Sequence, residues 1–206
     1  MLAKAYRIET ERLVIRCYQP QDAGLLKTSI DESLEHLLPW MTWAKNEPET
    51  IQTKRERLRK YRGQFDLGID YTFGIFSRDE KELIGSTGLH TRLSGNAREI
   101  GYWIGAKHVM QGYATETVKA LIKVGFEIEE LDRIEIRIIP ENIASQRVPK
   151  KLAFLYEGTL KNRMADTEGQ PRDMMIWTMF KSDYLKQDHS DFYCKAFNMI
   201  GEQILV

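Results

Sequence analysis

Residues Glu99 to Glu116, EIGYWIGAKHVMQGYATE, have the pattern of a strand that continues through a polar loop into a helix. The strand covers Arg98–Ile104, and the helix begins at Gly112. Backbone N–H groups in the first turn of a helix have no partners within the helix, and they lie at the positive end of its dipole. This stretch therefore predicts an anion-binding site.

Glu99 stands at the start of the same strand. In a strand of period two its side chain shares a face with Gly101 and Trp103, while Tyr102 points to the opposite face. A carboxylate in this place is either an exposed strand end or a group that binds substrate or moves a proton.

A second polar group lies further along the chain, where Asn142 can cap a helix and Ser145 falls in its first turn. Pro149 in the same helix has no N–H, so it leaves the carbonyl of Ser145 without its helical partner. Ser145 can therefore support the cap or take part in chemistry. We expect His90 and His108 to be structural.

Hydrophobic periodicity and the positions of Gly and Pro predict the elements that must position these residues. Strands are expected at Glu11–Tyr18, Asp70–Ser77, Glu82–Leu93, Arg98–Ile104, Arg133–Ile139, Phe154–Leu160 and Met174–Phe180. Helices are expected at Gln21–Leu38, Glu49–Gly63, Tyr113–Glu130 and Ile143–Ala153. A helix joins Arg98–Ile104 to Arg133–Ile139, so these two strands should be parallel, whereas the three strands from Asp70 to Ile104 should form an antiparallel meander. The order predicts an α+β fold with a mixed sheet.

Composition limits the function classes. With 206 residues, of which 42% are hydrophobic, the chain can bury the core of one domain, which we place at residues 1–182 with an unplaced tail at 183–206. Lys plus Arg and Asp plus Glu both total 30, so no overall field favours nucleic acid or a membrane. Cys17 and Cys194 match no metal or redox spacing, and no apolar run reaches the roughly 20 residues of a membrane span. We expect a cytoplasmic protein without a metal site.

One segment departs from this balance. Residues 53–62, TKRERLRKYR, carry six cations and one Glu on an expected helix. Such a helix is either a solvated surface or a patch that binds RNA or an acidic partner.

Four segments, taken together, resemble the acyl-CoA N-acetyltransferases of the GNAT superfamily, and within it the RimJ/RimL-like branch that acetylates N-terminal amines of ribosomal proteins. The similar segments are ETERLVIRCYQPQDA (Glu9–Ala23), LLPWMTWA (Leu37–Ala44), REIGYWIG with QGYATE (Arg98–Gly105 and Gln111–Glu116) and PENIASQRVPKKLAFLYEG (Pro140–Gly158). They follow one another in the family's order and at consistent spacing, which a single short motif could not do.

The resemblance implies a GNAT-like α+β fold, with a mixed, mostly antiparallel sheet of about seven strands and helices on both faces. It also implies that acetyl-CoA is a substrate and that no metal takes part. The residues that would bind the coenzyme are Ile104, Met110, Gln111, Gly112, Tyr113, Ala114 and Asn142. Glu99 would accept the proton of the amine, and Ser145 would supply a proton to the leaving thiolate. Trp40, Trp43 and Tyr102 would wall the acceptor slot, although core packing is the commoner role of such side chains.

The sequence departs from the family pattern at three positions. Val109 stands where Gln or Arg is usual, Met110 where an additional Gly often lies, and Pro149 where many members have a tyrosine that protonates the thiolate. Our main interpretation is acetyl transfer to a protein N-terminus. The alternatives are transfer to a small amine, such as a polyamine, an aminoglycoside or an amino acid, and a coenzyme-binding module without catalysis. The resemblance is compatible with a homodimer, and we expect no nucleic-acid partner apart from a contact with the ribosome.

Overall fold

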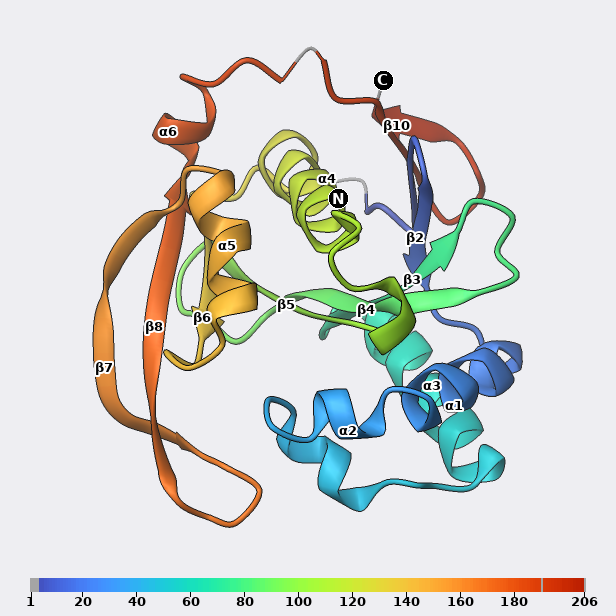
Figure 1. Cartoon of the computed structure of the whole chain (residues 1–206). Coiled ribbons are helices and arrows are strands. Elements are labelled where there is room, and N and C mark those ends of the chain that lie inside the picture. The colour runs from blue at the N-terminus through green and yellow to red at the C-terminus, as the bar shows by residue number, and fades with distance from the viewer. Residues whose placement is uncertain (1–3, 190, 206) are drawn as a thin grey trace.

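The computed structural model describes residues 4–189 and 191–205. Ten strands form one sheet in the order β10-β9-β1-β2-β3-β4-β5-β6-β8-β7 (Figure 1). The strands are β1 Arg7–Thr10, β2 Leu13–Cys17, β3 Tyr71–Ser77, β4 Leu83–His90, β5 Ala97–Ile104, β6 Arg133–Ile138, β7 Leu155–Ala165, β8 Pro171–Phe180, β9 Cys194–Phe197 and β10 Gln203–Leu205. The α-helices are α1 Ala23–Asp31, α2 Leu34–Leu37, α3 Ile51–Asp66, α4 Tyr113–Glu127, α5 Ile143–Lys151 and α6 Lys181–Tyr184.

The pairing of the strands confirms the predicted α+β fold with a mixed, mostly antiparallel sheet. The strands β3, β4 and β5 form the expected meander, and β5 and β6 are parallel as expected from the helix between them. The other neighbouring pairs among the described strands are antiparallel. The number of strands is ten rather than about seven, because β1, β9 and β10 were not predicted.

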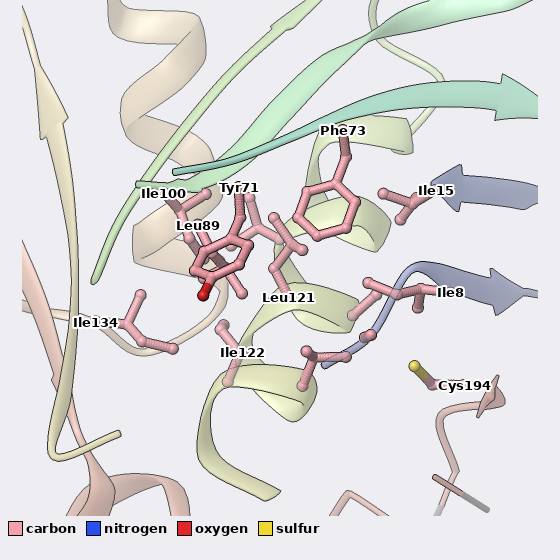
Figure 2. Packing of buried hydrophobic residues seen from close by; sticks show 14 of the residues in the cluster. Ile8, Ile15, Tyr71, Phe73, Leu89, Ile100, Leu121, Ile122, Ile134 and Cys194 are labelled. Carbon is pink, nitrogen blue, oxygen red and sulfur yellow. The ribbon is translucent and has the colours of Figure 1, made fainter. Parts of the chain in front are cut away.

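Helices cover both faces of the sheet, as predicted. Helix α4 packs on one face, where Leu121 and Ile122 meet Ile100 and Ile134 from the strands in the larger hydrophobic cluster (Figure 2). On the other face, Leu26 of α1 and Leu58 of α3 pack with further strand residues in a second cluster. We call these the α4 face and the α1 face. Alternation along β2 feeds both clusters, because Leu13 and Ile15 lie in the first and Val14 in the second.

The first predicted strand differs from the structure. The sheet strand begins at Leu13 rather than Glu11, and the residues before it fold back as β1, paired from Arg7 to Glu9 with β2. The turn between them is held by Thr10, whose hydroxyl accepts a hydrogen bond from the N–H of Leu13 at 3.1 Å. This side-chain hydrogen bond closes the turn after β1, so the chain reverses at Thr10 and the strand predicted from Glu11 begins only at Leu13.

The long first helix predicted at Gln21–Leu38 is divided into α1 and α2. The break lies at Ser33, whose hydroxyl accepts a hydrogen bond from the N–H of Ala106, directly after β5. Close approach of this region to β5 also depends on Gly105, where an added Cβ would come within 3.3 Å of Ser29 and Ser33. The helix is therefore divided by a hydrogen bond between Ser33 and Ala106, which are 73 residues apart in sequence.

Helix α3 begins two residues later than predicted, and its cap is Thr50, which accepts a hydrogen bond from the N–H of Thr53 at 3.1 Å. Several cations of this helix are paired with nearby carboxylates. Lys54 is fully buried and forms ion pairs with Glu47 and Glu49, and Arg57 lies 2.5 Å from Glu49. Arg59 and Arg62 pair with Glu56 and Asp66 on the same helix. The helix is therefore less basic at its surface than its sequence indicates.

The segment after residue 182, left unplaced by the sequence, adds two strands to the far edge of the sheet. After α6 the chain passes above α4 to the opposite side of the molecule (Figure 1). There β9 pairs with β1 from Arg7↔Phe197 to Thr10↔Cys194, and β10 pairs with β9. The sheet thus extends past the residue at which we placed the end of the domain. No helix in the described ranges is long and apolar enough to cross a membrane.

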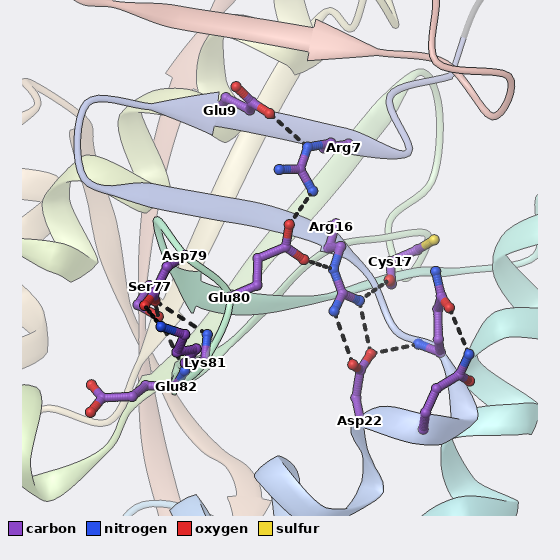
Figure 3. A network of polar contacts seen from close by, with 12 residues as sticks. Arg7, Glu9, Arg16, Cys17, Asp22, Ser77, Asp79, Glu80, Lys81 and Glu82 are labelled. Atoms are coloured by element: carbon purple, nitrogen blue, oxygen red, sulfur yellow. Dashed lines mark hydrogen bonds and ion pairs between the residues drawn. The ribbon is translucent and has the colours of Figure 1, made fainter.

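An ion-pair network joins this edge of the sheet to the turn between β3 and β4 (Figure 3). Glu80 receives hydrogen bonds from Arg7 at 2.6 Å and from Arg16 at 2.5 Å. Arg16 also forms a two-pronged pair with Asp22 at 2.8 and 2.9 Å. One carboxylate at a turn therefore connects both strands of the β1–β2 hairpin.

Candidate active site

The parallel strands β5 and β6 separate in the middle of the sheet. Their ladder runs from Ala97↔Arg133 to Glu99↔Glu135 and then ends, although β5 continues to Ile104 and β6 to Ile138. Beyond Glu99, β5 pairs only with β4, and β6 only with β8, among the described strands. Peptide groups on the facing edges of β5 and β6 are therefore available to hydrogen-bond a third, extended group.

The predicted anion site lies at the end of β5, where the loop leads into α4. Gly112 is the N-cap at φ 84°, and the first helical hydrogen bond runs from the N–H of Glu116 to the carbonyl of Gly112. The amides of Tyr113, Ala114 and the next residue precede this bond, so they have no acceptor within the helix. A glycine cap also brings no side-chain oxygen to compete for them. The geometry fits an anion such as a pyrophosphate.

The two unusual loop residues, Met110 and Val109, differ in backbone conformation. Met110 has φ 60°, in the left-handed region that favours glycine, and its side chain is 82% exposed. Val109 has an ordinary extended backbone. Met110 thus takes the backbone conformation of the glycine often found there, with its side chain in solvent.

Arg12, which the sequence analysis did not select, holds this loop to the β1–β2 turn. Its guanidinium lies 2.6 Å from Glu116 and 2.9 Å from the carbonyl of Gln111, and it stacks 4.6 Å from the centre of the Tyr113 ring. An added Cβ on Gly112 would come within 3.4 Å of it. A cation therefore lies beside the predicted pyrophosphate amides. The sequence signal was only its place within the segment Glu9–Ala23.

Tyr102 and Ser145 form a hydrogen-bonded pair on the α4 face. The Tyr102 hydroxyl donates to the carbonyl of Ser145 at 3.2 Å and lies 2.9 Å from the Ser145 hydroxyl. This is the carbonyl that Pro149 leaves without a helical partner. Burial raises the pKa of the Tyr102 phenol to about 12, and the hydrogen bond with Ser145 opposes this shift. Tyr102 is therefore a neutral proton donor at physiological pH.

Asn142 caps α5, because its side-chain oxygen accepts a hydrogen bond from the N–H of Ser145 at 3.0 Å. This side-chain oxygen is therefore already used in the helix cap.

Ile104, which is also predicted to contact the coenzyme, lies at the end of β5 next to the loop, where it is buried in the cluster of the α4 face.

The three aromatic residues predicted to wall the acceptor slot lie on different faces. Trp43 packs on the α1 face against Trp103 of β5, with ring centres 6.1 Å apart. Tyr102 points to the α4 face, as alternation along β5 requires. Trp40 follows α2 and is half-buried, and no ring contact is found for it among the described residues. The structure therefore brings Trp43 together with Trp103 and separates both from Tyr102.

Glu99 lies on the α1 face, where it is largely buried and paired with two arginines. Its carboxylate oxygens lie 3.2 Å from Arg92 and 3.5 Å from Arg137. Arg137 also contacts Glu135, the neighbour of Glu99 across the parallel pair, at 3.2 Å. The carboxylate expected to act as the base is thus held in a charged network at the point where the two strands separate.

Three comparisons relate the chain to known proteins. The model of the acetyltransferase (GNAT) domain matches residues 12–155. The chain is 30% identical over 177 residues to the uncharacterized N-acetyltransferase YoaA of Bacillus subtilis (strain 168). This alignment covers 84% of the present chain and 96% of that protein. It is 28% identical over 183 residues to the ribosomal protein uS5-alanine N-acetyltransferase of Escherichia coli (strain K12), covering 86% and 92% of the two chains.

A solved structure supports the same fold. The RimL ribosomal L7/L12 α-N-protein acetyltransferase in complex with coenzyme A has a TM-score of 0.75 at 17% identity, covering 89% of this chain and 99% of that chain. In the described part of the present chain, no group of three or more His, Cys, Asp or Glu side chains is placed to hold a metal ion.

Proposed function

Because this chain belongs to the GNAT acetyltransferase family and is an N-acetyltransferase, we propose that it transfers the acetyl group of acetyl-CoA to the α-amine at a protein N-terminus. One observation carries the proposal. The separation of β5 and β6 lies between a helix start without a side-chain cap on the α4 face and an aromatic contact beside paired charges on the α1 face. Two substrates can therefore meet there from opposite sides of the sheet.

The donor is assigned to the α4 face. The pyrophosphate would accept hydrogen bonds from the amides at Met110 to Ala114, beside the charge of Arg12. The pantetheine arm is an extended chain with two amides, and it can pair with the free edge of β5 beyond Glu99. This path places the thioester near Tyr102 and Ser145.

The reaction needs a neutral amine, which attacks the thioester carbonyl carbon; the C–S bond then breaks and the thiolate takes a proton. We assign that proton to the pair of Tyr102 and Ser145. The two hydroxyls lie 2.9 Å apart, and the burial of Tyr102 keeps its phenol protonated until it is needed. The pair would replace the tyrosine that Pro149 displaces in α5.

The acceptor is assigned to the α1 face, beside Trp43 and Trp103. The carboxylates of Glu99 and Glu135 also lie there, each paired with arginines, so the aromatic wall rather than net charge would contact the acceptor. A peptide α-amine has a pKa of about 8, compared with about 10.4 for lysine. Removing its proton at neutral pH therefore costs less free energy than removing that of a lysine side chain. The E. coli relative named as an acetyltransferase for an alanine of a ribosomal protein supports the same acceptor class.

The test is acetylation of matched peptides. The purified protein is incubated with acetyl-CoA and peptides that begin with Ala or Ser and contain an internal lysine, and fragmentation mass spectrometry locates the acetyl group. We expect transfer to the α-amine only. The same peptides with a blocked N-terminus should stay unmodified, and Ala114→Asp, which places a carboxylate among the pyrophosphate amides, should be inactive.

Three results would contradict the proposal. Acetylation of a polyamine, an aminoglycoside or a free amino acid, with no peptide modified, would identify a small-molecule enzyme. Calorimetric binding of acetyl-CoA without acetylation of any amine would favour a coenzyme-binding module without catalysis, and absence of binding at millimolar acetyl-CoA would contradict both interpretations. Cytoplasmic location, a homodimer and contact with the ribosome remain predictions, and α3 offers a ribosome fewer free cations than its sequence indicates.

A further inference from the structure

His90 ends β4 on the α1 face, directly opposite Glu99 of β5. Its ring nitrogen Nδ1 lies 2.8 Å from the carboxylate of Asp70, the residue before β3. The other oxygen of Asp70 accepts a hydrogen bond from the N–H of Thr91 at 3.0 Å. Both oxygens of Asp70 are therefore oriented, and the carboxylate holds the imidazole in one position.

The charge state of Asp70 determines which nitrogen of His90 can accept a proton. Burial opposes ionisation of Asp70, but the hydrogen bond and charge of His90 outweigh it and keep the pKa of Asp70 below its usual value. An ionised carboxylate only accepts hydrogen bonds, so it places the hydrogen of a neutral imidazole on Nδ1. The lone pair then lies on Nε2, which has no hydrogen bond to another residue in the described part of the chain.

Two glycines give the imidazole its place above the sheet. An added Cβ on Gly88 would come within 2.5 Å of the Cε1 and Nε2 atoms of His90, and one on Gly101 within 3.5 Å of Nε2. Gly88 and Gly101 are paired across β4 and β5. The next pair on this face is Ser86 and Trp103, so Nε2 lies between Asp70 and the Trp43–Trp103 contact.

The neighbouring charged groups do not use Nε2. Glu99 is paired with Arg92 and Arg137, and Arg137 also contacts Glu135. On the α3 side, Tyr61 has its pKa raised by burial, with smaller effects from the charges of Arg57, Asp70 and Arg92. The phenol of Tyr61 is therefore neutral. Within 4 Å of a Cβ added on Gly101, leaving out its chain neighbours, the described structure places only Cδ2 and Nε2 of His90.

We propose that Nε2 of His90 is the general base that deprotonates the acceptor amine, with Asp70 as its positioning residue. The assignment rests on the proposed function, since it requires amine acetylation at the point where β5 and β6 separate. The ammonium nitrogen transfers one proton to Nε2, directly or through one water, and the ring becomes an imidazolium paired with Asp70. The freed lone pair then attacks the thioester carbon, and the C–S bond breaks as the thiolate takes a proton from the Tyr102–Ser145 pair. The nitrogen loses its second proton to solvent as the amide forms, the imidazolium also returns its proton to solvent, and solvent restores the proton of the Tyr102–Ser145 pair. The His–Asp pair, rather than Glu99, carries the proton.

The test compares His90→Gln, Asp70→Asn and Glu99→Gln with the wild-type enzyme, in release of coenzyme A with an Ala-initial peptide at pH 6 to 10. His189→Gln is the matched control, because that histidine stacks on Tyr184 of α6, away from the acceptor face. For His90→Gln we expect kcat at pH 7 to fall by roughly 10²–10³-fold with an unchanged KM for acetyl-CoA. The deficit should shrink above the amine pKa of about 8, where the substrate deprotonates without help. Asp70→Asn should show a smaller loss with the same pH trend.

Each contrary result has a distinct meaning. A His90→Gln enzyme with wild-type rates, or a loss that is equal at every pH, would overturn the assignment while acetyl transfer itself stands. A pH-dependent loss in Glu99→Gln alone would move the base to that carboxylate. Should His90→Gln fail to fold, the pH profile of Asp70→Asn decides the question. A wild-type enzyme that acetylates no amine would overturn both this base and the proposed function.

Discussion

At the scale of single residues, the pair of Tyr102 and Ser145 explains how the chain tolerates proline in α5. Proline within a helix leaves one carbonyl without its partner, and here that carbonyl accepts the Tyr102 hydroxyl. The same contact holds the phenol against the Ser145 hydroxyl, next to the free edge of β5. The Tyr102 side chain therefore both satisfies the carbonyl that Pro149 leaves free and is a candidate proton donor.

Tyr102→Phe tests this pair, because it removes the hydroxyl and retains the ring. We expect kcat to fall by roughly 10²-fold with little change in the KM for acetyl-CoA, since the lost proton acts only on the leaving thiolate. Ser145→Ala should give a similar fall, and the double variant should be no slower than either single one if the two hydroxyls act as a unit. Steady-state kinetics with a peptide acceptor measure all three. Full activity in Tyr102→Phe would contradict the assignment.

The sequence predicted some of these residues and not their partners. Alternation along β5 correctly separated Tyr102 from Trp103, and the loss of a helical hydrogen bond at Ser145 followed from Pro149 alone. The contact of His90 with Asp70 joins residues 20 positions apart, one at the end of β4 and one just before β3, and that of Arg12 with Glu116 joins residues 104 positions apart. Such contacts depend on sheet order, which no local pattern contains.

At the scale of elements, the loop before α4 holds an avoidable strain at Met110. A non-glycine residue at φ 60° costs about 1–2 kcal/mol relative to its preferred regions. The Met110 side chain is mostly exposed, so little packing offsets this energy. The loop keeps the shape that presents its amides even though the residue does not favour it.

Met110→Gly should therefore raise the free energy of unfolding, by up to about 1 kcal/mol after the greater chain entropy of glycine is subtracted. Affinity for acetyl-CoA should be unchanged or higher. Met110→Ala is the control, because it removes the side chain and keeps the strained backbone, so its stability should stay near that of the wild type. Urea unfolding and calorimetry measure the two quantities. A less stable glycine variant would show that the Met110 side chain makes contacts that matter.

Most elements could be predicted from periodicity, since β3, β5, β6 and α4 begin within one residue of their predicted starts. The predictions are wrong where a residue distant in sequence determines where a helix or strand begins or ends. Ser33 divides the first helix because its hydroxyl bonds the N–H of Ala106, and β9 is a strand of four residues that exists because β1 offers it an edge.

At the scale of the whole molecule, the network around Glu80 makes stability depend on pH. Burial alone would raise the pKa of Glu80, but hydrogen bonds and charge from Arg16 and Arg7 lower it below the ordinary 4.5. A carboxyl whose pKa is lower in the folded state stabilises the protein above the unfolded-state pKa, and that contribution is lost as the pH falls through the folded-state pKa. The protein should therefore lose stability below about pH 4.5.

Glu80→Gln should reduce the free energy of unfolding at pH 7 by roughly 0.5–1 kcal/mol, a value kept small by solvent screening of a partly exposed group. The difference from the wild type should narrow as the pH approaches 3, because both side chains are then neutral. Glu82→Gln on the same turn is the control, since its exposed carboxylate forms no ion pair within the described ranges. Denaturant unfolding between pH 3 and 7 measures the effect. A constant difference across that range would contradict it.

The ending of the β5–β6 ladder at Glu99 has one more consequence. If the pantetheine arm pairs with this free edge, as the proposed function requires, the donor substrate would become part of the folded structure. Mass action then links the fraction of unfolded chain to the concentration of that substrate. In a cell the lifetime of this protein against proteolysis would rise and fall with the supply of acetyl-CoA, and its abundance would report on metabolism before any acceptor is modified.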